Sequence, residues 1–239
     1  MNAFDRTTRT PAPNRPVFAT PVRAASPGAA SALPAGRVLR NTYALLSLTL
    51  LFSAAVATLS ATLQLPAPGL LLTLGGYFGL LFAVHKTQNS AAALAAVFAL
   101  TGFMGYTLGP VLSKTLVLPG GAQVVALALA ATGVTFLALS AWVLTTRRDF
   151  SFMGGFLFAG MIIAVLAGVG AVFLEIPALG VTVAAMVALL SAGLILFETS
   201  RIVHGGETNY VLATVGFYVS LFNLFTSLLS LFGVGRSED

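Results

Sequence analysis

Charged side chains are scarce in this sequence of 239 residues. Only 8% of the residues are Asp, Glu, Lys or Arg, whereas 57% are hydrophobic. A soluble domain of this length could not cover its surface with so little charge. The composition therefore predicts a polytopic helical membrane protein, most of which is surrounded by lipid.

Cysteine is absent, which excludes disulfides, thiolate catalysis and zinc or iron–sulfur sites built on cysteine. The two histidines, His85 and His204, fall outside the long apolar runs and form no HExxH motif, so neither a zinc metalloprotease nor an intramembrane serine protease fits. The last apolar run has no lysine for a retinal Schiff base, and no glycine-rich phosphate loop precedes a lysine. We expect no enzymatic activity, cofactor or metal site.

Long apolar runs fill the chain from Thr42 to Gly233, and each approaches the roughly 20 residues that a helix needs to cross a bilayer. A barrel would alternate apolar and polar residues, and these runs do not. The predicted fold is all-α, with seven transmembrane helices. The expected spans are Thr42–Leu63, Gly69–Val84, Ser90–Leu112, Gly121–Thr145, Phe152–Leu174, Pro177–Phe197 and Tyr210–Phe232, and the longest loop is Thr199–Asn209.

Basic residues alternate between the two sides of this predicted bundle. Starting from the N-terminus, alternate connections carry Arg37, Arg40, Lys86, Arg147, Arg148 and Arg201, whereas the opposite connections carry only Lys114, and Arg236 follows the last span. Basic residues near span ends stay in the cytoplasm. We therefore predict a cytoplasmic N-terminus and, after seven crossings, a periplasmic C-terminus.

Residues 1–40 differ from the rest, because they are rich in Pro, Ala, Ser, Thr and Arg and hold one acidic residue, Asp5. Such a segment cannot bury enough apolar surface to offset its ordering entropy. We interpret residues 1–40 as a disordered cytoplasmic tail, residues 41–233 as the membrane domain and residues 234–239 as a short periplasmic tail. An organelle transit peptide is the alternative for the basic N-terminal segment. The arginines form no structured patch, so nucleic-acid binding is not expected. The tail arginines are Arg6, Arg9, Arg15 and Arg23.

Small residues at helical spacing predict close packing between helices. Gly102, Gly105 and Gly109 share one face of the third span, and Gly160, Ala164 and Gly168 share one face of the fifth. Pro110 is expected to bend or end the third helix.

The last span carries a stripe of small and polar residues. Its members recur at spacings of three and four: Ala213, Gly216, Ser220, Asn223, Ser227 and Ser230. A polar stripe facing lipid would be costly, so it must face other helices or water. It fits a central helix hydrogen-bonded to its neighbours, and it also fits the lining of a polar or ion pathway, in which Asn223 has both donor and acceptor capacity.

Glu198 lies at the cytoplasmic end of the sixth span, and Arg201 follows one turn later. One interpretation is an interfacial acid neutralised by Arg201 at i,i+3 or by the nearby arginines of the preceding cytoplasmic connection. The other is a titratable gate residue that is protonated or coordinates an ion.

Several segments resemble the Bax inhibitor/YccA family. They are the loop segment 197–210, which reads FETSRIVHGGETNY, the last-helix segments 218–225 and 231–233, residues 40–43 (RNTY), residues 101–103 with Gly105, and residues 148–151 (RDFS). The resemblance covers about residues 37–233 and is nearest to the bacterial YccA branch.

The resemblance implies six helices around a central seventh. Animal and some bacterial members are described as calcium-leak channels gated by two aspartates, whose positions here hold Glu198 and Ser220. Because a like-charge dyad needs two carboxyls, this pair is broken. The YccA branch is described instead as a substrate and modulator of an FtsH-type ATP-dependent protease of the bacterial inner membrane.

The favoured hypothesis is therefore a non-enzymatic, multi-pass inner-membrane protein whose tail is captured by such a protease while its packed body resists extraction. The alternative is a pH-sensitive Ca²⁺ or H⁺ leak through Glu198, Ser220 and Asn223. A small-solute transporter is disfavoured, because neither inverted repeats nor paired broken helices are present.

Overall fold

The computed structural model describes residues 35–234, and within that range the chain forms seven long helices and no strand. The helices are α1 (Ala35–Thr62), α2 (Leu70–Thr87), α3 (Ala92–Val117), α4 (Gly121–Thr146), α5 (Gly154–Phe173), α6 (Pro177–Val203) and α7 (Tyr210–Val234), with a 3-10 turn η1 (Ser151–Met153) before α5. All seven are long and apolar enough to cross a membrane. The predicted all-α fold with seven spans is confirmed.

Two predicted boundaries are wrong. The first helix begins at Ala35, so residues 35–40 belong to α1 and not to the tail, whose remainder lies outside the described residues. The sixth helix continues to Val203, so the predicted loop Thr199–Asn209 begins only after that residue and is shorter than expected. In this last part of α6 the Thr199 hydroxyl donates to the carbonyl of Ile195, one turn earlier.

The end of α6 is fixed by a glycine turn. Gly205 has a left-handed φ of 74°, which only glycine adopts without strain. Gly206 N–H donates to the Arg201 carbonyl at 2.8 Å, and Gly205 N–H donates to the Ile202 carbonyl at 3.3 Å, as in a Schellman motif. Asn209 then caps α7, since its side-chain oxygen accepts a hydrogen bond from Val211 N–H at 2.9 Å.

Pro110 lies inside α3 without ending it. A proline has no N–H to donate to the carbonyl four residues earlier, which here belongs to Tyr106. The hydroxyl of Ser60 in α1 donates to that carbonyl at 3.1 Å. The helix therefore continues to Val117, so of the two expected outcomes at Pro110, a bend or an end, the end is wrong.

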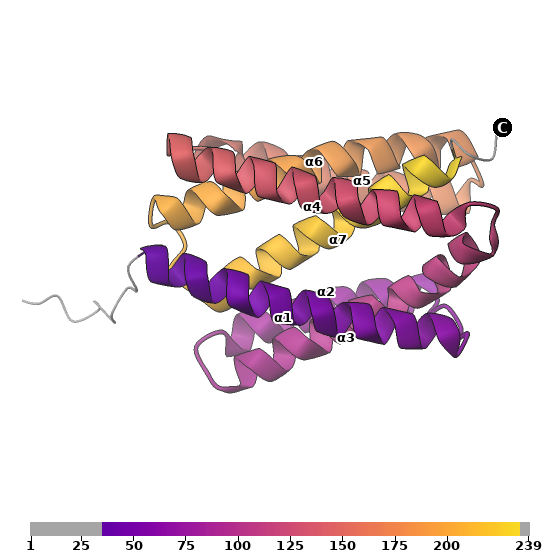
Figure 1. Ribbon diagram of the computed structural model, residues 1–239, viewed down its shortest axis with the longest axis horizontal. Coiled ribbons are helices and arrows are strands. Elements are labelled where there is room, and N and C mark those ends of the chain that lie inside the picture. The colour runs from indigo at the N-terminus through magenta and orange to yellow at the C-terminus, as the bar shows by residue number, and fades with distance from the viewer. Residues whose placement is uncertain (1–34, 235–239) are drawn as a thin grey trace, which may run out of the picture. The chain divides into compact units, whose positions relative to one another are not determined.

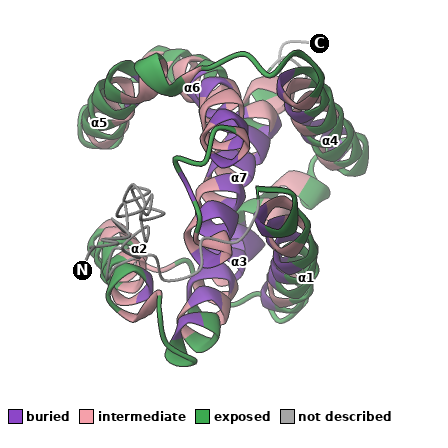
Figure 2. Ribbon diagram, turned by 90° about the vertical axis from the view of Figure 1, so that its left-hand side faces the viewer, coloured by how far each residue is buried: buried purple, intermediate pink, exposed green. Residues whose placement is uncertain are grey.

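Helix α7 lies in the middle of the bundle. In Figure 1 it crosses between a group formed by α1, α2 and α3 and a second group formed by α4, α5 and α6. It packs against α1, α3, α4 and α6, while α2 packs against α3 and α5 against α6 (Figure 2). Half of the most apolar stretch of α7 is buried, against 6% for α2. The predicted central position of the last helix is confirmed.

Glycines bring α3 close to α1, as the spacing predicts. A Cβ added at Gly105 would lie 2.5 Å from the carbonyl oxygen of Ser53, and one at Gly109 would collide with Ser60. In the same way Gly160 of α5 leaves room for Leu190 of α6. These contacts are within one chain and account for the small-residue series without a second copy.

Candidate functional site

Three connections meet at the end of the bundle where α6 gives way to α7. Asn209, in the α6–α7 loop, donates from its side-chain amide to the carbonyl of Gln88 in the α2–α3 loop at 3.1 Å. His204, in the same α6–α7 loop, contacts the carbonyl of Arg147 in the α4–α5 connection at 3.0 Å through Nε2. We call this the loop end of the molecule, and it holds most of the ionisable groups of the described chain.

Ser200 and His204, whose Oγ and Nδ1 lie 3.4 Å apart, anchor the α4–α5 connection. The buried Ser200 hydroxyl accepts a hydrogen bond from Phe150 N–H at 2.8 Å, and both ring nitrogens of His204 face backbone carbonyls. Asp149 lies on the exposed side of this anchor. Hydrogen bonds donated by the Ser151 side chain and backbone hold the pKa of the Asp149 carboxyl below its usual value.

Arg201 pairs with Glu207 and not with Glu198. The guanidinium nitrogen Nη2 lies 3.1 Å from Glu207 Oε2, and the guanidinium stands over the ring of Phe197 at 5.5 Å from its centroid. Glu207 Oε1 also accepts a hydrogen bond from Asn209 N–H at 2.9 Å. The loop thus supplies the acid that neutralises Arg201, six residues along the chain.

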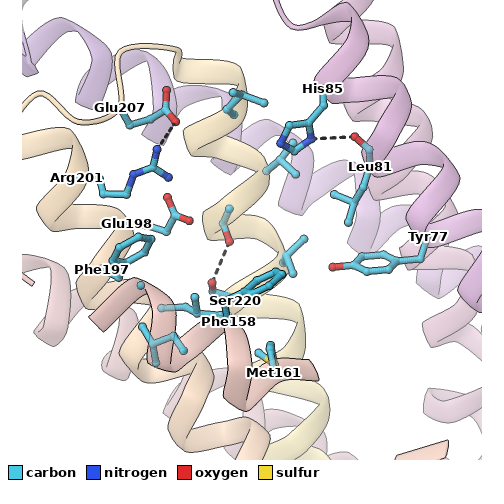
Figure 3. Close-up of a pocket in the computed structure, with 17 residues that line it drawn as sticks. Tyr77, Leu81, His85, Phe158, Met161, Phe197, Glu198, Arg201, Glu207 and Ser220 are labelled. Carbon is cyan, nitrogen blue, oxygen red and sulfur yellow. Dashed lines mark hydrogen bonds and ion pairs between the residues drawn. The ribbon is translucent and has the colours of Figure 1, made fainter. Parts of the chain in front are cut away.

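Glu198 is left without a hydrogen bond or ion pair among the described residues. Its carboxylate lies against Gly216 of α7, where an added Cβ would be 2.6 Å from Oε1 (Figure 3). Gly216, a member of the predicted stripe, therefore makes room for this carboxylate. Neither Arg147 nor Arg148 forms an ion pair with it, and the only ion pair found in residues 35–234 is that of Arg201 with Glu207.

Glu198 faces a cavity of about 400 Å³ between α2, α5, α6 and α7. Ser220 also lines this cavity, so the structure brings together the two residues that stand in place of the family's acidic pair. The Ser220 hydroxyl donates within α7 to the carbonyl of Gly216 at 2.9 Å. Tyr77 and His85 of α2 line the opposite wall (Figure 3).

Asn223 lies further along α7 and lines an adjoining cavity of about 580 Å³ between α2, α3, α5, α6 and α7. Its side-chain amide has no hydrogen-bond partner among residues 35–234. The rest of the stripe divides: Ser227 is buried, but Ser230 is exposed, so the stripe is not shielded along its whole length.

Sequence reasoning missed the polar contact on the opposite side of α7. The buried hydroxyl of Tyr218 lies 2.6 Å from the Ser53 hydroxyl of α1 and donates to the Thr101 carbonyl of α3 at 3.2 Å. One phenol therefore joins three helices. The tyrosine sits among apolar residues in the sequence, and nothing in the local pattern identifies partners more than a hundred residues away.

One predicted group has no described structure. The tail arginines Arg6, Arg9, Arg15 and Arg23 lie outside the described residues. Within residues 35–234, no group of three or more His, Asp or Glu side chains could hold a metal ion. What the site offers is a lone carboxylate, a serine hydroxyl and a free amide along one face of α7.

Comparison with known proteins places the chain. A model of the family described as inhibitor of apoptosis-promoting Bax1 matches residues 35–237. The chain is 52% identical over 208 residues to the modulator of FtsH protease YccA from Escherichia coli, a match that covers 87% of this chain and 94% of that protein. An uncharacterised protein of Pseudomonas aeruginosa is 49% identical over 202 residues, 84% of this chain and 91% of its own. An uncharacterised membrane protein of Vibrio cholerae is 44% identical over 209 residues, 87% of this chain and 93% of its own. With seven membrane-length helices, the last of them central, and with these matches over nearly its whole membrane domain, the chain belongs to the Bax inhibitor family and is similar to its YccA proteins.

Proposed function

We propose that this chain is a multi-pass protein of the bacterial inner membrane that modulates an FtsH-type ATP-dependent membrane protease. The observation that carries the proposal is the identity of 52% over 94% of a protein named modulator of FtsH protease. In this proposal the chain is not an enzyme: it is a substrate that the protease engages and extracts slowly, so that the protease is occupied.

The packing of α7 supports slow extraction. Its buried side chains include Phe217, Tyr218 and Leu221, and the hydroxyl of Tyr218 is bonded to two other helices. A helix withdrawn from this position leaves buried polar groups unpaired in a membrane, which is unfavourable. The loop end adds hydrogen bonds between connections that a pulling force has to break.

We propose, from its composition alone, that the N-terminal segment, residues 1–34, is where the protease first engages the chain. The contacts of Asn209 and His204 with the other connections support the orientation, since they gather the basic connections at one end, which the positive-inside rule assigns to the cytoplasm. In this proposal the segment before α1 is on the side of the membrane where such a protease acts.

Deletion of residues 2–30 tests whether the protease engages the N-terminal segment. The shortened chain is expected to be degraded more slowly and to lose its effect on degradation of a second membrane substrate, measured as half-lives in cells with normal and depleted protease. A version in which the four tail arginines are changed to glutamine separates charge from length. Unchanged inhibition by the shortened chain contradicts a role for the tail.

A cation leak is the second candidate, favoured by the line of Glu198, Ser220 and Asn223 along two adjoining cavities. The test is reconstitution into liposomes with a calcium-sensitive dye or a pH dye. A flux that Glu198→Gln abolishes and Glu175→Gln preserves supports the leak. Liposomes as tight as protein-free ones count against it and leave the protease proposal standing.

A further inference from the structure

The two cavities form one groove that opens sideways between α2 and α5. They share the lining residues Tyr77, Leu81, Phe158, Met161, Leu194 and Val219. Figure 2 shows α2 and α5 standing apart on the same side of α7, to its left. Exposed apolar side chains border the opening, among them Phe78 of α2 and Phe158 and Leu166 of α5. In a membrane this opening faces acyl chains, and we call it the lateral groove.

The polar groups of the lateral groove are concentrated at its loop end. Glu198 and the hydroxyl of Tyr77 point into the cavity from opposite walls and have no hydrogen-bond partner among the described residues (Figure 3). His85 also lines this end, and its Nδ1 contacts its own helix at the Leu81 carbonyl. The rest of the groove is apolar, apart from Ser220, Asn223 and two threonines. An amphiphile with one polar end matches this distribution.

The charges of the polar end select a particular headgroup. In its ionised form the carboxyl group of Glu198 accepts hydrogen bonds and carries negative charge, and a ligand with a positively charged N–H donor favours that form. Arg201 is already neutralised by Glu207, but a third of its side chain remains exposed beside the cavity, where it can contact a phosphate. A headgroup that joins a primary ammonium to a phosphate therefore meets both partners.

The size of the groove favours one lipid chain over a protein helix. The cavities of about 400 and 580 Å³ fall in the range of about 300–1,000 Å³ that is typical of small-ligand pockets. A membrane helix, about 10 Å in diameter and about 30 Å long, needs several times that space. We propose that the lateral groove binds one acyl chain of a phospholipid with a primary-ammonium headgroup, the ammonium contacting Glu198 and the phosphate contacting Arg201.

Native mass spectrometry of the full chain, purified in detergent, tests the headgroup. Dioleoyl phosphatidylethanolamine, phosphatidylcholine and phosphatidylglycerol are titrated separately. Retention of one phosphatidylethanolamine is expected to exceed that of the other two by about tenfold, since choline has no N–H and glycerol no positive charge. Glu198→Gln is expected to remove most of this preference, and the matched variant Glu175→Gln, in the connection between α5 and α6, to retain it. Equal retention of the three lipids, or a preference that survives Glu198→Gln, overturns the proposal.

The position of the bound acyl chain can be measured as well, because the sequence has no cysteine and a single introduced cysteine is the only site that a thiol-reactive fluorophore labels. A fluorophore attached through Val165→Cys lies in the lateral groove, and one attached through Leu129→Cys lies on the outside of α4. Nitroxide-labelled phosphatidylethanolamine at one equivalent per protein is expected to quench the first label several times more than the second. Phe158→Trp, a change of an exposed side chain that narrows the groove, is expected to reduce that difference. Equal quenching of both labels, or a difference that Phe158→Trp leaves unchanged, contradicts the assignment.

Discussion

Opposite faces of α7 have different surroundings. On the closed face, Phe217, Tyr218, Leu221 and Leu224 are buried against other helices, and the tyrosine hydroxyl has two partners. On the open face, Gly216, Val219, Ser220 and Asn223 line the lateral groove. The closed face holds the bundle together, and the open face leaves polar groups available. One face of α7 thus stabilises the bundle and the other is available to a ligand. Substitutions on the closed face should lower stability more than substitutions on the open face.

The largest expected effect is on the closed side, where α1 and α3 meet. Gly105→Ala places a methyl group 2.5 Å from the backbone carbonyl oxygen of Ser53, which cannot rotate away. We expect a loss of about 1–3 kcal/mol of stability, visible as a lower Tm in detergent. Gly79→Ala in α2 is the matched control, because nothing lies within 4 Å of its added Cβ. It should be neutral or stabilising, since alanine favours helix. Equal Tm values for the two variants would show that α1 and α3 are not in close contact.

Tyr218→Phe removes the hydroxyl that joins α7 to α1 and α3. The expected loss is about 1 kcal/mol, because the Ser53 hydroxyl is left without this partner in a buried site. Tyr106→Phe removes a hydroxyl that bonds to the Pro66 carbonyl at an exposed position, and it should lower the Tm less. A larger loss for Tyr106→Phe would mean that the closed face is not the more important one.

Ser60→Ala should lower the free energy of unfolding about as much as Tyr218→Phe or slightly less. It removes the hydrogen bond to the Tyr106 carbonyl, which receives none from Pro110. The explanation can be checked with a double-mutant cycle. In a Pro110→Ala background the alanine N–H can donate to that carbonyl, so Ser60→Ala should then cost less by about 0.5–1 kcal/mol. Additive effects of the two substitutions would falsify the explanation that the Ser60 hydroxyl replaces the hydrogen bond that Pro110 cannot donate.

The smallest effect is expected on the open face. Asn223→Leu removes an amide that has no hydrogen-bond partner within residues 35–234, so stability should change by no more than about 0.5 kcal/mol. Thermal unfolding in detergent is the measurement. A loss as large as that of Gly105→Ala would place Asn223 in a bonded core and remove the distinction between the two faces.

The fold was largely predictable from the sequence because the bilayer sets the length of each apolar run. The local stripe on the last span likewise predicted that α7 is central. The partners of Tyr218 were not predictable, since Ser53 and Thr101 come from distant helices. The lateral groove could not be predicted either, because it depends on the distance between α2 and α5.

Arg201 illustrates the limit of local spacing. At i,i+3, Glu198 is the partner that an uninterrupted helix suggests. The reversal at Gly205 brings the loop back over the end of α6, and Glu207 takes the guanidinium instead. The chain direction after a helix end therefore decided which carboxylate was paired and which was left facing the cavity.

The position of α7 has a consequence for biogenesis. Among the helices of residues 35–234, the central one, α7, is the last that the ribosome makes. During translation, the earlier helices enter the bilayer before the side chains that will separate them exist. Their final arrangement must wait for the C-terminal segment to insert between partners already in place, so a nascent chain interrupted before Tyr210 has every outer wall and no centre.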